Sequence, residues 1–381
     1  MFTAHIYPII STKQHGFMPK RSTSSNLNLL TQDLSQNFNK RQQTDVIYID
    51  FSKAFDSISH EILVHKLNIV AGLSRYLVNW TRENLSDRKY KVILNGFESN
   101  IFIANSGVPQ GSILGPILFI TYINDLPDYI ESSKCLMFAD DLKLYKTITH
   151  ENHCKLLQKD LLRLENWCSL NKMSINNEKS FITTFSNIKS PINCKYKINN
   201  LEVKREILVR DLGILFDSKL SFKHHFKSIS LKANKMLGFI FQRSKDFKNP
   251  KTFLYLYKTL IRPSLEYSST TWNLHYMADK VSLEKIQNKF LKFLNRKFPQ
   301  NKNYENLCSR FKLASLESRR DINDYIFIYK LLIKKIDSPV LQSSIKIKIP
   351  DPRFRNNRPF LTENKIHNNI GGNSLINRTC R

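Results

Sequence analysis

The sequence predicts an α+β fold in two parts that differ in charge. β-favouring runs alternate with amphipathic helices up to about residue 217, and long helices dominate beyond it. The 381 residues carry 59 Lys and Arg against 32 Asp and Glu, a formal net charge of +27. Residues 1–150 hold 15 basic and 13 acidic side chains, whereas residues 151–381 hold 44 and 19. The second part is a polycation, which favours a nucleic-acid partner, although charge alone is equally typical of a merely basic surface.

Composition excludes several classes of protein. With 41% hydrophobic residues the chain can bury a sizeable core, which excludes a disordered acidic tail and a small stapled scaffold. No window approaches about 18 uninterrupted apolar residues and no secretory signal opens the chain, so we expect a soluble, intracellular protein. The cysteines lack a C-x-x-C pair and are irregularly spaced, so we expect free thiols in a reducing compartment. They are Cys135, Cys154, Cys168, Cys194, Cys308 and Cys380.

A helix and a buried strand come first. The apolar residues of 27–40 recur three or four positions apart, which is the spacing of one helix face. Val46–Ile49 is a continuous apolar run, as expected of a strand covered on both faces, and it ends abruptly at Asp50. The first strand therefore ends in a carboxylate.

Two helices and two hairpins follow. Residues 58–70 return to helical spacing, and Ser74 can cap the next helix, which runs to about residue 85. Asn95-Gly96 between β-rich runs predicts a hairpin. A Gly/Pro loop, residues 106–111, precedes Ser112, which we expect to cap a helix. The second hairpin has apolar arms and places Asp140-Asp141 in its turn.

The rest of the chain is expected to turn from sheet to helix. A helix over 156–167 and strands over 180–185 and 207–216 complete the first part. Long helices follow over 222–240, from Asn249-Pro250 and from Asp279, with lysines and arginines on their outer faces. We expect His224 and His225 to be part of that basic surface.

The residues that can do chemistry are carboxylates at strand ends. Asp50 ends one buried strand, and Asp140 and Asp141 occupy a hairpin turn, so adjacent strand ends could bring the three together. Three converging carboxylates repel one another unless a divalent cation neutralises them, and oxygen ligands indicate Mg²⁺ or Mn²⁺. A site with two such ions is typical of in-line attack of a hydroxyl on a phosphate. Taken singly, each carboxylate is better explained by ordinary turn chemistry or strand termination. Taken together, and followed by a basic part of the chain, the three favour a metal site.

A series of motifs resembles the reverse transcriptase of non-LTR retrotransposons, close to the jockey-like LINE elements. QHGFMPKRST (14–23) resembles the opening fingers motif, and VIYIDFSKAFDSISHEIL (46–63) resembles motif A of the palm. SGVPQGSILGPILFITYINDLP (106–127) resembles motif B, and FADD (138–141) is the motif C box. LNKMSINNEKS (170–180), LGILFDSKLSF (212–222) and LIRPSLEYSSTTW (260–272) are similar to motif D, motif E and the region after the polymerase.

The resemblance implies a role for each matching position. The metal ligands, for two Mg²⁺ or Mn²⁺ ions, would be Asp50, Asp140, Asp141 and the backbone carbonyl of Phe51. Phe55 would exclude the 2′-hydroxyl of a ribonucleotide, or else simply pack in the core. Gln110 and Gly111 would lie beside the incoming nucleotide and the template base. Lys179 would protonate the pyrophosphate leaving group, and Lys20 and Arg21 would touch template or triphosphate, although solvated lysines and arginines are common at such positions.

By this resemblance the fold is a right-hand polymerase with a palm, partial fingers and a helical thumb. We expect partial fingers over 1–45, the palm over 46–217, a basic helical thumb over 218–345 and a loosely ordered basic tail over 346–381. Partners would be an RNA template, a DNA primer and dNTPs, with no membrane; localisation would be nuclear by resemblance alone. The sequence does not indicate an oligomeric state.

Two functions remain open at this stage. One is an RNA-directed DNA polymerase of a mobile element. The other is a truncated or co-opted nucleic-acid-binding remnant without polymerase activity, because the upstream fingers and endonuclease of full elements are not in this sequence. An RNA polymerase acting on RNA is disfavoured by Phe55 and by the alanine of FADD.

Overall fold

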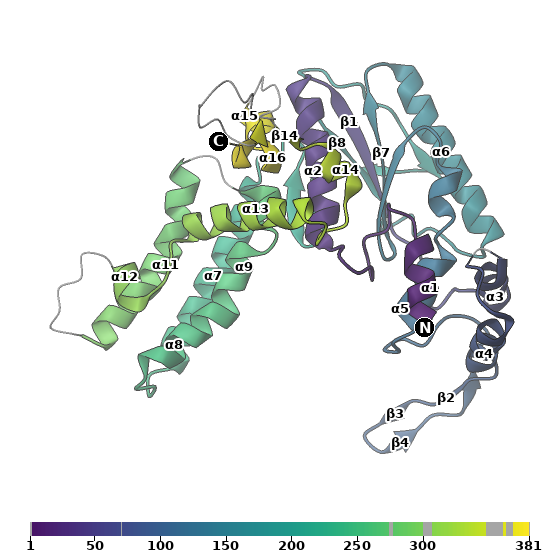
Figure 1. The fold of residues 1–381 in the computed structure, drawn as a ribbon, viewed down its shortest axis with the longest axis horizontal. Helices are drawn as coiled ribbons and strands as arrows, with labels where there is room; N and C mark the ends of the chain where they lie inside the picture. Colours follow the sequence, from purple (N-terminus) through teal and green to yellow (C-terminus); the bar gives the residue numbers. More distant parts are fainter. Residues whose placement is uncertain are drawn as a thin grey trace, which may run out of the picture. The chain divides into compact units, whose positions relative to one another are not determined.

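The computed structural model describes residues 2–69, 71–273, 277–299, 307–347, 361–362 and 369–380. They form two compact units, residues 1–26 with 41–207 and residues 27–40 with 208–381 (Figure 1). Within the described residues, helices and strands alternate in the first unit and helices dominate the second, so the predicted α+β class is confirmed.

The first unit is built on a five-stranded sheet in the order β11-β8-β1-β7-β6. Its strands are β1 (Gln43–Ile49), β6 (Lys134–Phe138), β7 (Asp141–Ile148), β8 (Phe181–Phe185) and β11 (Lys204–Arg205). The central strand β1 pairs antiparallel with both β7 and β8, with Ile47 opposite Leu144 and Ile182. All seven residues of β1 are buried: the apolar run 46–49, as predicted, and also the three polar residues before it. β1 ends at the same end of the sheet as the β6–β7 turn, so Asp50, which follows β1, lies at that end.

Helices and short hairpins complete the first unit. The helices are α1 (Phe2–Ile6), η1 (Tyr7–Ile9), α3 (His60–Ile69), α4 (Arg75–Leu85), α5 (Gly115–Tyr122), η2 (Leu126–Tyr129) and α6 (Glu151–Leu170). The remaining strands are β2 (Lys89–Tyr90), β3 (Ile93–Leu94), β4 (Phe97–Glu98), β5 (Phe102–Ile103), β9 (Lys197–Ile198) and β10 (Leu201–Glu202). The predicted Asn95-Gly96 hairpin is β3–β4, and Ser74 caps α4 by accepting a hydrogen bond from the Leu77 N–H.

The helix after loop 106–111 begins two residues later than predicted. Its first residue is Gly115 and its N-cap position is Leu114, so Ser112 is not the cap. The Ser112 hydroxyl instead accepts a hydrogen bond from the Gly115 N–H at 2.9 Å and donates one to the Pro109 carbonyl at 2.7 Å. Pro116 lies in the first turn, where a helix needs no N–H, so the start moves to the glycine before it.

The cysteine prediction is wrong at one pair. Cys154 on α6 and Cys194 form a disulfide with their Cα atoms 6.2 Å apart, while Cys135, Cys168, Cys308 and Cys380 are not disulfide-bonded. The two bonded cysteines lie 40 residues apart, and strand β8 lies between α6 and Cys194. Sequence spacing carries no signal for a pair brought together in this way.

The second unit is mainly helical. It contains part of α2 (Thr23–Asn39), whose residues from Leu27 onward belong to this unit. Its other helices are α7 (Lys223–Arg243), α8 (Pro250–Leu256), the π-helix η3 (Tyr257–Ile261), α9 (Arg262–Glu266), α10 (Ser269–Trp272), α11 (Met277–Lys297), α12 (Leu307–Phe311), α13 (Leu316–Leu332), α14 (Pro339–Ser343), α15 (Asn369–Gly372) and α16 (Leu375–Thr379). Its strands are β12 (Leu208–Asp211), β13 (Ile214–Asp217), β14 (Lys346–Ile347) and β15 (Leu361–Thr362).

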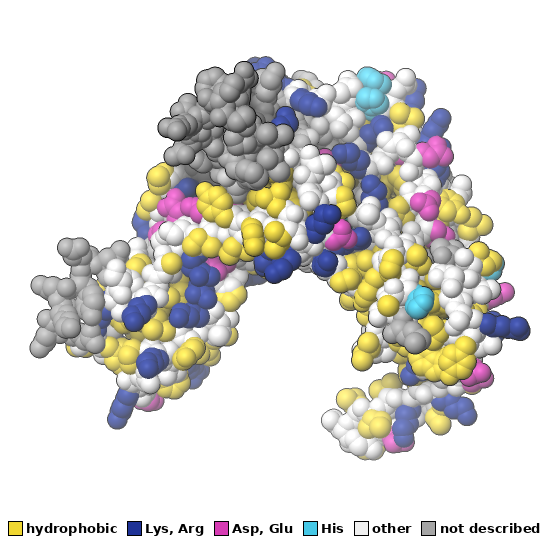
Figure 2. Space-filling model, viewed as in Figure 1, with side chains coloured by type: hydrophobic (Ala, Val, Ile, Leu, Met, Phe, Trp, Pro, Cys, Tyr) yellow, Lys and Arg dark blue, Asp and Glu magenta, His cyan; other side chains and the backbone are white. Residues whose placement is uncertain are grey.

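Aromatic stacking joins the long helices of this unit. Phe241 of α7 stacks on Phe293 of α11 with ring centroids 3.9 Å apart, and Tyr257 stacks on Phe290 at 4.5 Å. The buried Tyr257 hydroxyl donates to the Gln287 amide oxygen, so its polar group is satisfied. Lysines and arginines occupy the outer faces of these helices, where Figure 2 shows them in dark blue.

Part of the expected loosely ordered tail is described. Arg378 of α16 donates from Nε to an oxygen of Asp324 on α13 at 2.6 Å, and both side chains are largely buried. Residues 348–360, 363–368 and 381 lie outside the described residues, so the expectation that the tail is loosely ordered is not tested there.

His225 departs from the expected basic surface, whereas His224 is exposed. His225 is only 4% exposed, and its ring packs edge-on against Trp272 with centroids 5.0 Å apart. Its Nδ1 accepts a hydrogen bond from the Leu215 N–H at 3.3 Å, a role open only to an unprotonated nitrogen. Burial, with the charges of Arg210 and Lys232, lowers the pKa of His225 to about 4.

This burial predicts a loss of stability in acid. The folded pKa is below the ordinary value of about 6.5, so the unfolded chain binds the proton first. The neutral ring's full contribution is present above pH 6.5 and is lost as the pH falls toward 4, by up to about 3 kcal/mol. Thermal melts between pH 7.5 and 4 should show a smaller decline for His225→Gln than for the wild type. The exposed His224→Gln is the control, and equal pH profiles for the two variants would contradict the assignment.

Candidate active site

Asp140 lies in a two-residue turn at one edge of the sheet. Phe138 of β6 pairs with Asp141 of β7, so the turn residues are Ala139 and Asp140. Ala139 adopts a positive φ of 55°, as tight hairpin turns require. Asp141 is the exposed first residue of β7, which differs from the expectation that it shares the turn. The pairing of Phe138 decides this difference, and composition does not reveal that register.

Asp50 follows the last residue of β1, and its backbone is held from a distant segment. The Asp50 carbonyl accepts a hydrogen bond from the Asn176 N–H at 2.8 Å, and the Ser52 N–H donates to the Ser174 carbonyl at 2.8 Å. These two bonds flank an antiparallel bridge between Phe51 and Ile175. They use the backbone groups of Asp50 and Ser52, so the Phe51 carbonyl is not an acceptor in the bridge.

The two carboxylates are close enough to repel each other. Partial burial raises the pKa of Asp140, and the negative charge of Asp50 raises it further, while a hydrogen bond to the Asp140 backbone opposes both. Continuing the β1–β7 register by one residue puts Asp50 opposite Asp141. The Lys179 ammonium lies 3.6 Å from a carboxylate oxygen of Asp50, although its side chain is 71% exposed. The strand ends therefore gather Asp50, Asp140 and Lys179 in one place.

These residues suit a hard divalent cation in donor chemistry. Asp50 and Asp140 offer charged oxygens and repel each other, so a cation between them would offset the unfavourable charge. Across the part of the chain that the structure describes, no group of three or more His, Cys, Asp or Glu side chains is gathered closely enough to hold a metal ion. The structure thus brings two carboxylates together, with Asp141 beside them in register but outside any such cluster.

The loop at 106–111 is fastened to the segment that follows Asp50. The Val108 N–H donates to the Phe55 carbonyl at 2.9 Å, and the Gly107 N–H donates to the Ile58 carbonyl at 2.8 Å. Gly107 has a φ of 86°, and a Cβ there would lie 2.8 Å from the Asp56 Cα, so only glycine fits. The Gln110 side chain is held too, because its amide nitrogen donates to an Asp56 carboxylate oxygen at 2.9 Å. Gly111 follows with a φ of 79° and open space where a Cβ would lie.

Phe55 is half-buried beside this loop. Its ring stacks on Phe119 of α5 with centroids 4.4 Å apart and meets Phe17 edge-on at 6.2 Å. One side of the ring is therefore fixed by packing, as the alternative interpretation of core packing expects, while the residue remains partly accessible.

Lys20 and Arg21, the basic pair near the N-terminus, lie in different environments. Lys20 is exposed and has a positive φ of 62°. Arg21 is half-buried, and its Nη1 donates to the backbone carbonyls of Ser11 and Gln14, both at 2.7 Å. Arg21 therefore braces the segment 11–21, a role that its position in the sequence does not reveal.

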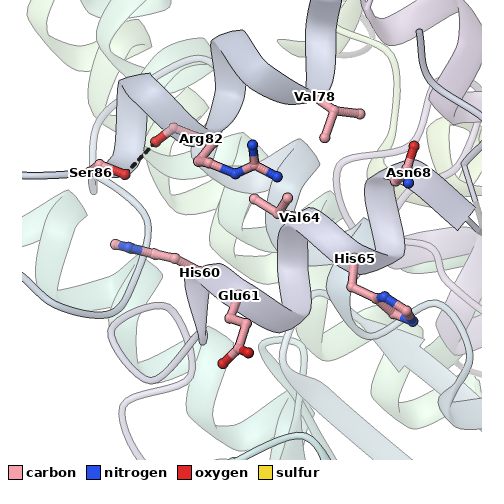
Figure 3. Close-up of a pocket in the computed structure, with 8 residues that line it drawn as sticks. All are labelled: His60, Glu61, Val64, His65, Asn68, Val78, Arg82 and Ser86. Atoms are coloured by element: carbon pink, nitrogen blue, oxygen red, sulfur yellow. Dashed lines mark hydrogen bonds between the residues drawn. The ribbon is translucent and has the colours of Figure 1, made fainter. Parts of the chain in front are cut away.

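A cavity of about 480 Å³ lies between α3 and α4. Figure 3 shows Arg82 reaching from α4 toward Val64 on α3. None of the residues predicted for the active site lines it. His60, one of the lining residues, donates from Nε2 to the Gly107 carbonyl at 2.7 Å, so the cavity wall is joined to the 106–111 loop.

Sequence reasoning missed the residues that hold the site from a distance. Asp56 holds Gln110 from 54 positions away, and Asn176 holds the Asp50 backbone from 126 positions away. The motifs that contain them give their order along the chain, but which of them are paired is known only from the fold.

None of the helices in the described part of the chain has the length and apolar character of a membrane span.

Comparison with known proteins identifies a matching family. The family model described as reverse transcriptase (RNA-dependent DNA polymerase) matches residues 1–241. The chain is 25% identical over 299 residues to the probable RNA-directed DNA polymerase from transposon BS of Drosophila melanogaster, covering 74% of this chain and 32% of that protein. It is 27% identical over 287 residues to the RNA-directed DNA polymerase from mobile element jockey of the same species, covering 72% and 30%.

The chain thus spans about a third of the length of these curated relatives. Among solved structures, apo telomerase from Candida tropicalis aligns with a TM-score of 0.38 at 12% identity, over 72% of this chain and 49% of that chain. Every residue of the candidate site lies within the stretch that the family model matches.

Proposed function

The chain belongs to the reverse transcriptase (RNA-dependent DNA polymerase) family, and from that premise we propose that it extends a DNA primer on an RNA template with dNTPs. The similarity to the polymerase of mobile element jockey also supports a non-LTR mobile element as the origin of this chain. The reaction is a nucleotidyl transfer, in which the primer 3′-hydroxyl attacks the α-phosphate of a dNTP and pyrophosphate leaves.

One observation carries the proposal. Asp50 and Asp140 lie at the same end of the central sheet, and burial together with the charge of Asp50 raises the pKa of Asp140. Two carboxylates in this relation are costly unless a cation joins them. A functional requirement for that cation accounts for an arrangement that folding alone disfavours.

The carboxylates would hold the metal. Asp50 and Asp140, with Asp141 and the Phe51 carbonyl beside them, are the proposed ligands of two Mg²⁺ or Mn²⁺ ions. When bound, the ions supply activation of the primer hydroxyl and stabilise the charge on the leaving pyrophosphate. Lys179 donates a proton to the leaving group, and its ammonium beside Asp50 is near enough to that edge to do so.

The incoming nucleotide would lie against the 106–111 loop and Phe55. Gln110 and Gly111 contact the nucleotide and the template base, and the positive φ of Gly111 lets the backbone approach closely. The accessible part of the Phe55 ring forms an apolar wall against the sugar, where a 2′-hydroxyl would find no partner.

Replacing Phe55 should relax the choice of sugar. Phe55→Val is expected to raise the efficiency of rNTP incorporation relative to dNTP by about tenfold to a hundredfold, because the shorter side chain leaves room for the hydroxyl. Single-nucleotide insertion with dTTP and UTP measures the ratio. Phe181→Val is the control, since Phe181 also stacks in the same unit, on Tyr48. An unchanged ratio in Phe55→Val would leave Phe55 as a packing residue only.

The basic residues would bind nucleic acid. In this proposal residues 1–45 are partial fingers, 46–217 the palm, 218–345 the thumb and 346–381 a basic tail. The exposed Lys20 contacts template or triphosphate, with Arg21 bracing its segment. The outer faces of α7 and α11 hold the duplex through its phosphates. The same resemblance places the reaction in the nucleus, where target DNA would supply the primer.

Primer extension tests the proposed function. Wild-type protein is given poly(rA)/oligo(dT), dTTP and Mg²⁺ or Mn²⁺, and elongated primers are resolved by electrophoresis. Extension that requires the metal is the expected result. Salt-dependent binding of the duplex without extension under either metal would overturn it and leave the alternative, a nucleic-acid-binding remnant, which the basic helices of the second unit favour.

A further inference from the structure

The segment 13–16 lies alongside the end of β6, immediately before the Asp140 turn. The Met137 N–H donates to the Lys13 carbonyl and the His15 N–H donates to the Met137 carbonyl, both at 2.9 Å. Gln14 and Met137 form a parallel bridge between them. A segment more than 120 residues earlier in the chain is thereby fixed next to the Ala139–Asp140 turn.

The Gln14 side chain holds the turn by both ends of its amide. Its oxygen accepts from the Ala139 N–H at 2.9 Å and from the Gly16 N–H at 2.7 Å. Its nitrogen donates to the Ala139 carbonyl at 3.2 Å. Gln14 is 1% exposed and Ala139 is 6% exposed, so water cannot replace these bonds. The amide thus satisfies both backbone polar groups of the residue that precedes Asp140.

Gly16 lets the two segments touch. A Cβ on Gly16 would lie 2.2 Å from the Ala139 nitrogen and 2.9 Å from the Ala139 Cα, so any other residue would displace the turn. Arg21 holds the backbone of Gln14, because its Nη1 donates to the Gln14 carbonyl at 2.7 Å.

We propose that Gln14 and Gly16 are positioning residues that hold the Ala139–Asp140 turn, and with it the Asp140 carboxylate, in the geometry that the metal needs. The turn requires such a hold because Ala139 is in the left-handed region and Asp50 repels Asp140 across the site. The inference rests on the proposed function, since it assigns these residues to the site of that reaction. It gives the opening QHG motif a task in the palm in addition to any contact with substrate.

The chain offers a matched control in Gln43. This glutamine is also 1% exposed, and its amide likewise holds one backbone position, donating to the Ile192 carbonyl and accepting from the Ile192 N–H, both at 2.8 Å. It lies at the opposite end of β1 from Asp50, about 20 Å away along the strand. The Gln43 amide nitrogen also donates to a carboxylate oxygen of Asp45 at 2.9 Å. Gln14→Met and Gln43→Met each remove a buried amide that is bonded to one backbone position, at similar volume, and only Gln14→Met does so at the turn.

The experiment compares these two variants with the wild type in three measurements. Hydrogen exchange of the metal-free proteins reports the Ala139 and Asp140 amides. Electron paramagnetic resonance of free Mn²⁺ gives the affinity for the metal alone. Primer extension gives kcat, the KM for dTTP and the Mg²⁺ concentration for half-maximal activity.

Gln14→Met should exchange faster at the turn, bind Mn²⁺ about tenfold more weakly and lose about a hundredfold in kcat, with the KM for dTTP nearly unchanged. Gln43→Met should match the wild type in all three. Should Gln14→Met fail to fold, Gly16→Ala, which retains the Gln14 side chain, is expected to show the same metal defect. Equal Mn²⁺ binding and turn exchange in the folded Gln14 or Gly16 variant and in Gln43→Met would overturn the inference. A wild type that extends no primer, together with weakened Mn²⁺ binding in Gln14→Met alone, would instead refute the proposed function and retain the positioning role.

Discussion

Primer extension by Asp140→Asn is expected to fall by about a thousandfold or more, while the protein remains folded. An amide carries no charge and offers one acceptor oxygen, so it removes several kcal/mol of the stabilisation that a metal-bound carboxylate supplies. The same substitution relieves a burial cost and the repulsion from Asp50, the two causes that raise the pKa of Asp140. The melting temperature of the metal-free protein should therefore stay level or rise, which is typical of a functional residue held in an unfavourable setting.

The control for this substitution is Asp128→Asn. Asp128 is an exposed carboxylate in η2 of the same unit, and its replacement should leave both extension and melting unchanged. A lower melting temperature for Asp140→Asn would argue for a structural carboxylate. Extension within tenfold of the wild type would remove Asp140 from the metal site altogether.

Removing a stripe of positive charge from α11 is expected to weaken duplex binding by about tenfold to a hundredfold at moderate salt. Four exposed basic residues of this helix recur at spacings of four, three and four, so they share one face. They are Lys285, Lys289, Lys292 and Arg296. If each neutralises a phosphate, changing all four to Gln should reduce the slope of log affinity against log salt by about 3.6. Fluorescence anisotropy of a labelled primer–template over a salt series measures both quantities.

A second set of four lysines distinguishes a binding face from net charge. Exposed lysines of the first unit, changed to Gln, lower the net charge by the same amount and should leave the salt slope within one of the wild type. They are Lys155, Lys159, Lys189 and Lys197. Equal losses from the two sets would mean that the whole polycation, rather than a face of α11, attracts the duplex.

Local structure followed the sequence wherever a short-range rule governs it. The apolar run 46–49 forms a buried part of strand β1, as predicted. Ser74 caps α4, Asn249 caps α8 and Asn95-Gly96 makes a hairpin turn, because each depends on the side chain and backbone of one or two residues. These elements needed no knowledge of the rest of the fold.

Predictions were wrong where a residue's surroundings come from far along the chain. His225 is buried against Trp272, 47 positions away, although its lysine-rich helix suggests a surface histidine. Cys154 is bonded to Cys194, although the spacing of the cysteines suggests free thiols. In both cases the residue's partner lies far along the chain. Tertiary packing brings the two together, and the sequence around either residue does not indicate it.

The sequence by itself determined the α+β class, the family motifs and the order in which Asp50, Asp140 and Lys179 follow one another, since these depend on residue type and spacing. Only the tertiary structure decided which backbone groups hold them. Gln14 reaches Ala139, Asn176 reaches Asp50 and Asp56 reaches Gln110 because the fold brings distant segments together. A hydrogen bond acts over about 3 Å in space and is indifferent to separation along the chain, so a motif records which residues serve the site but not which of them touch.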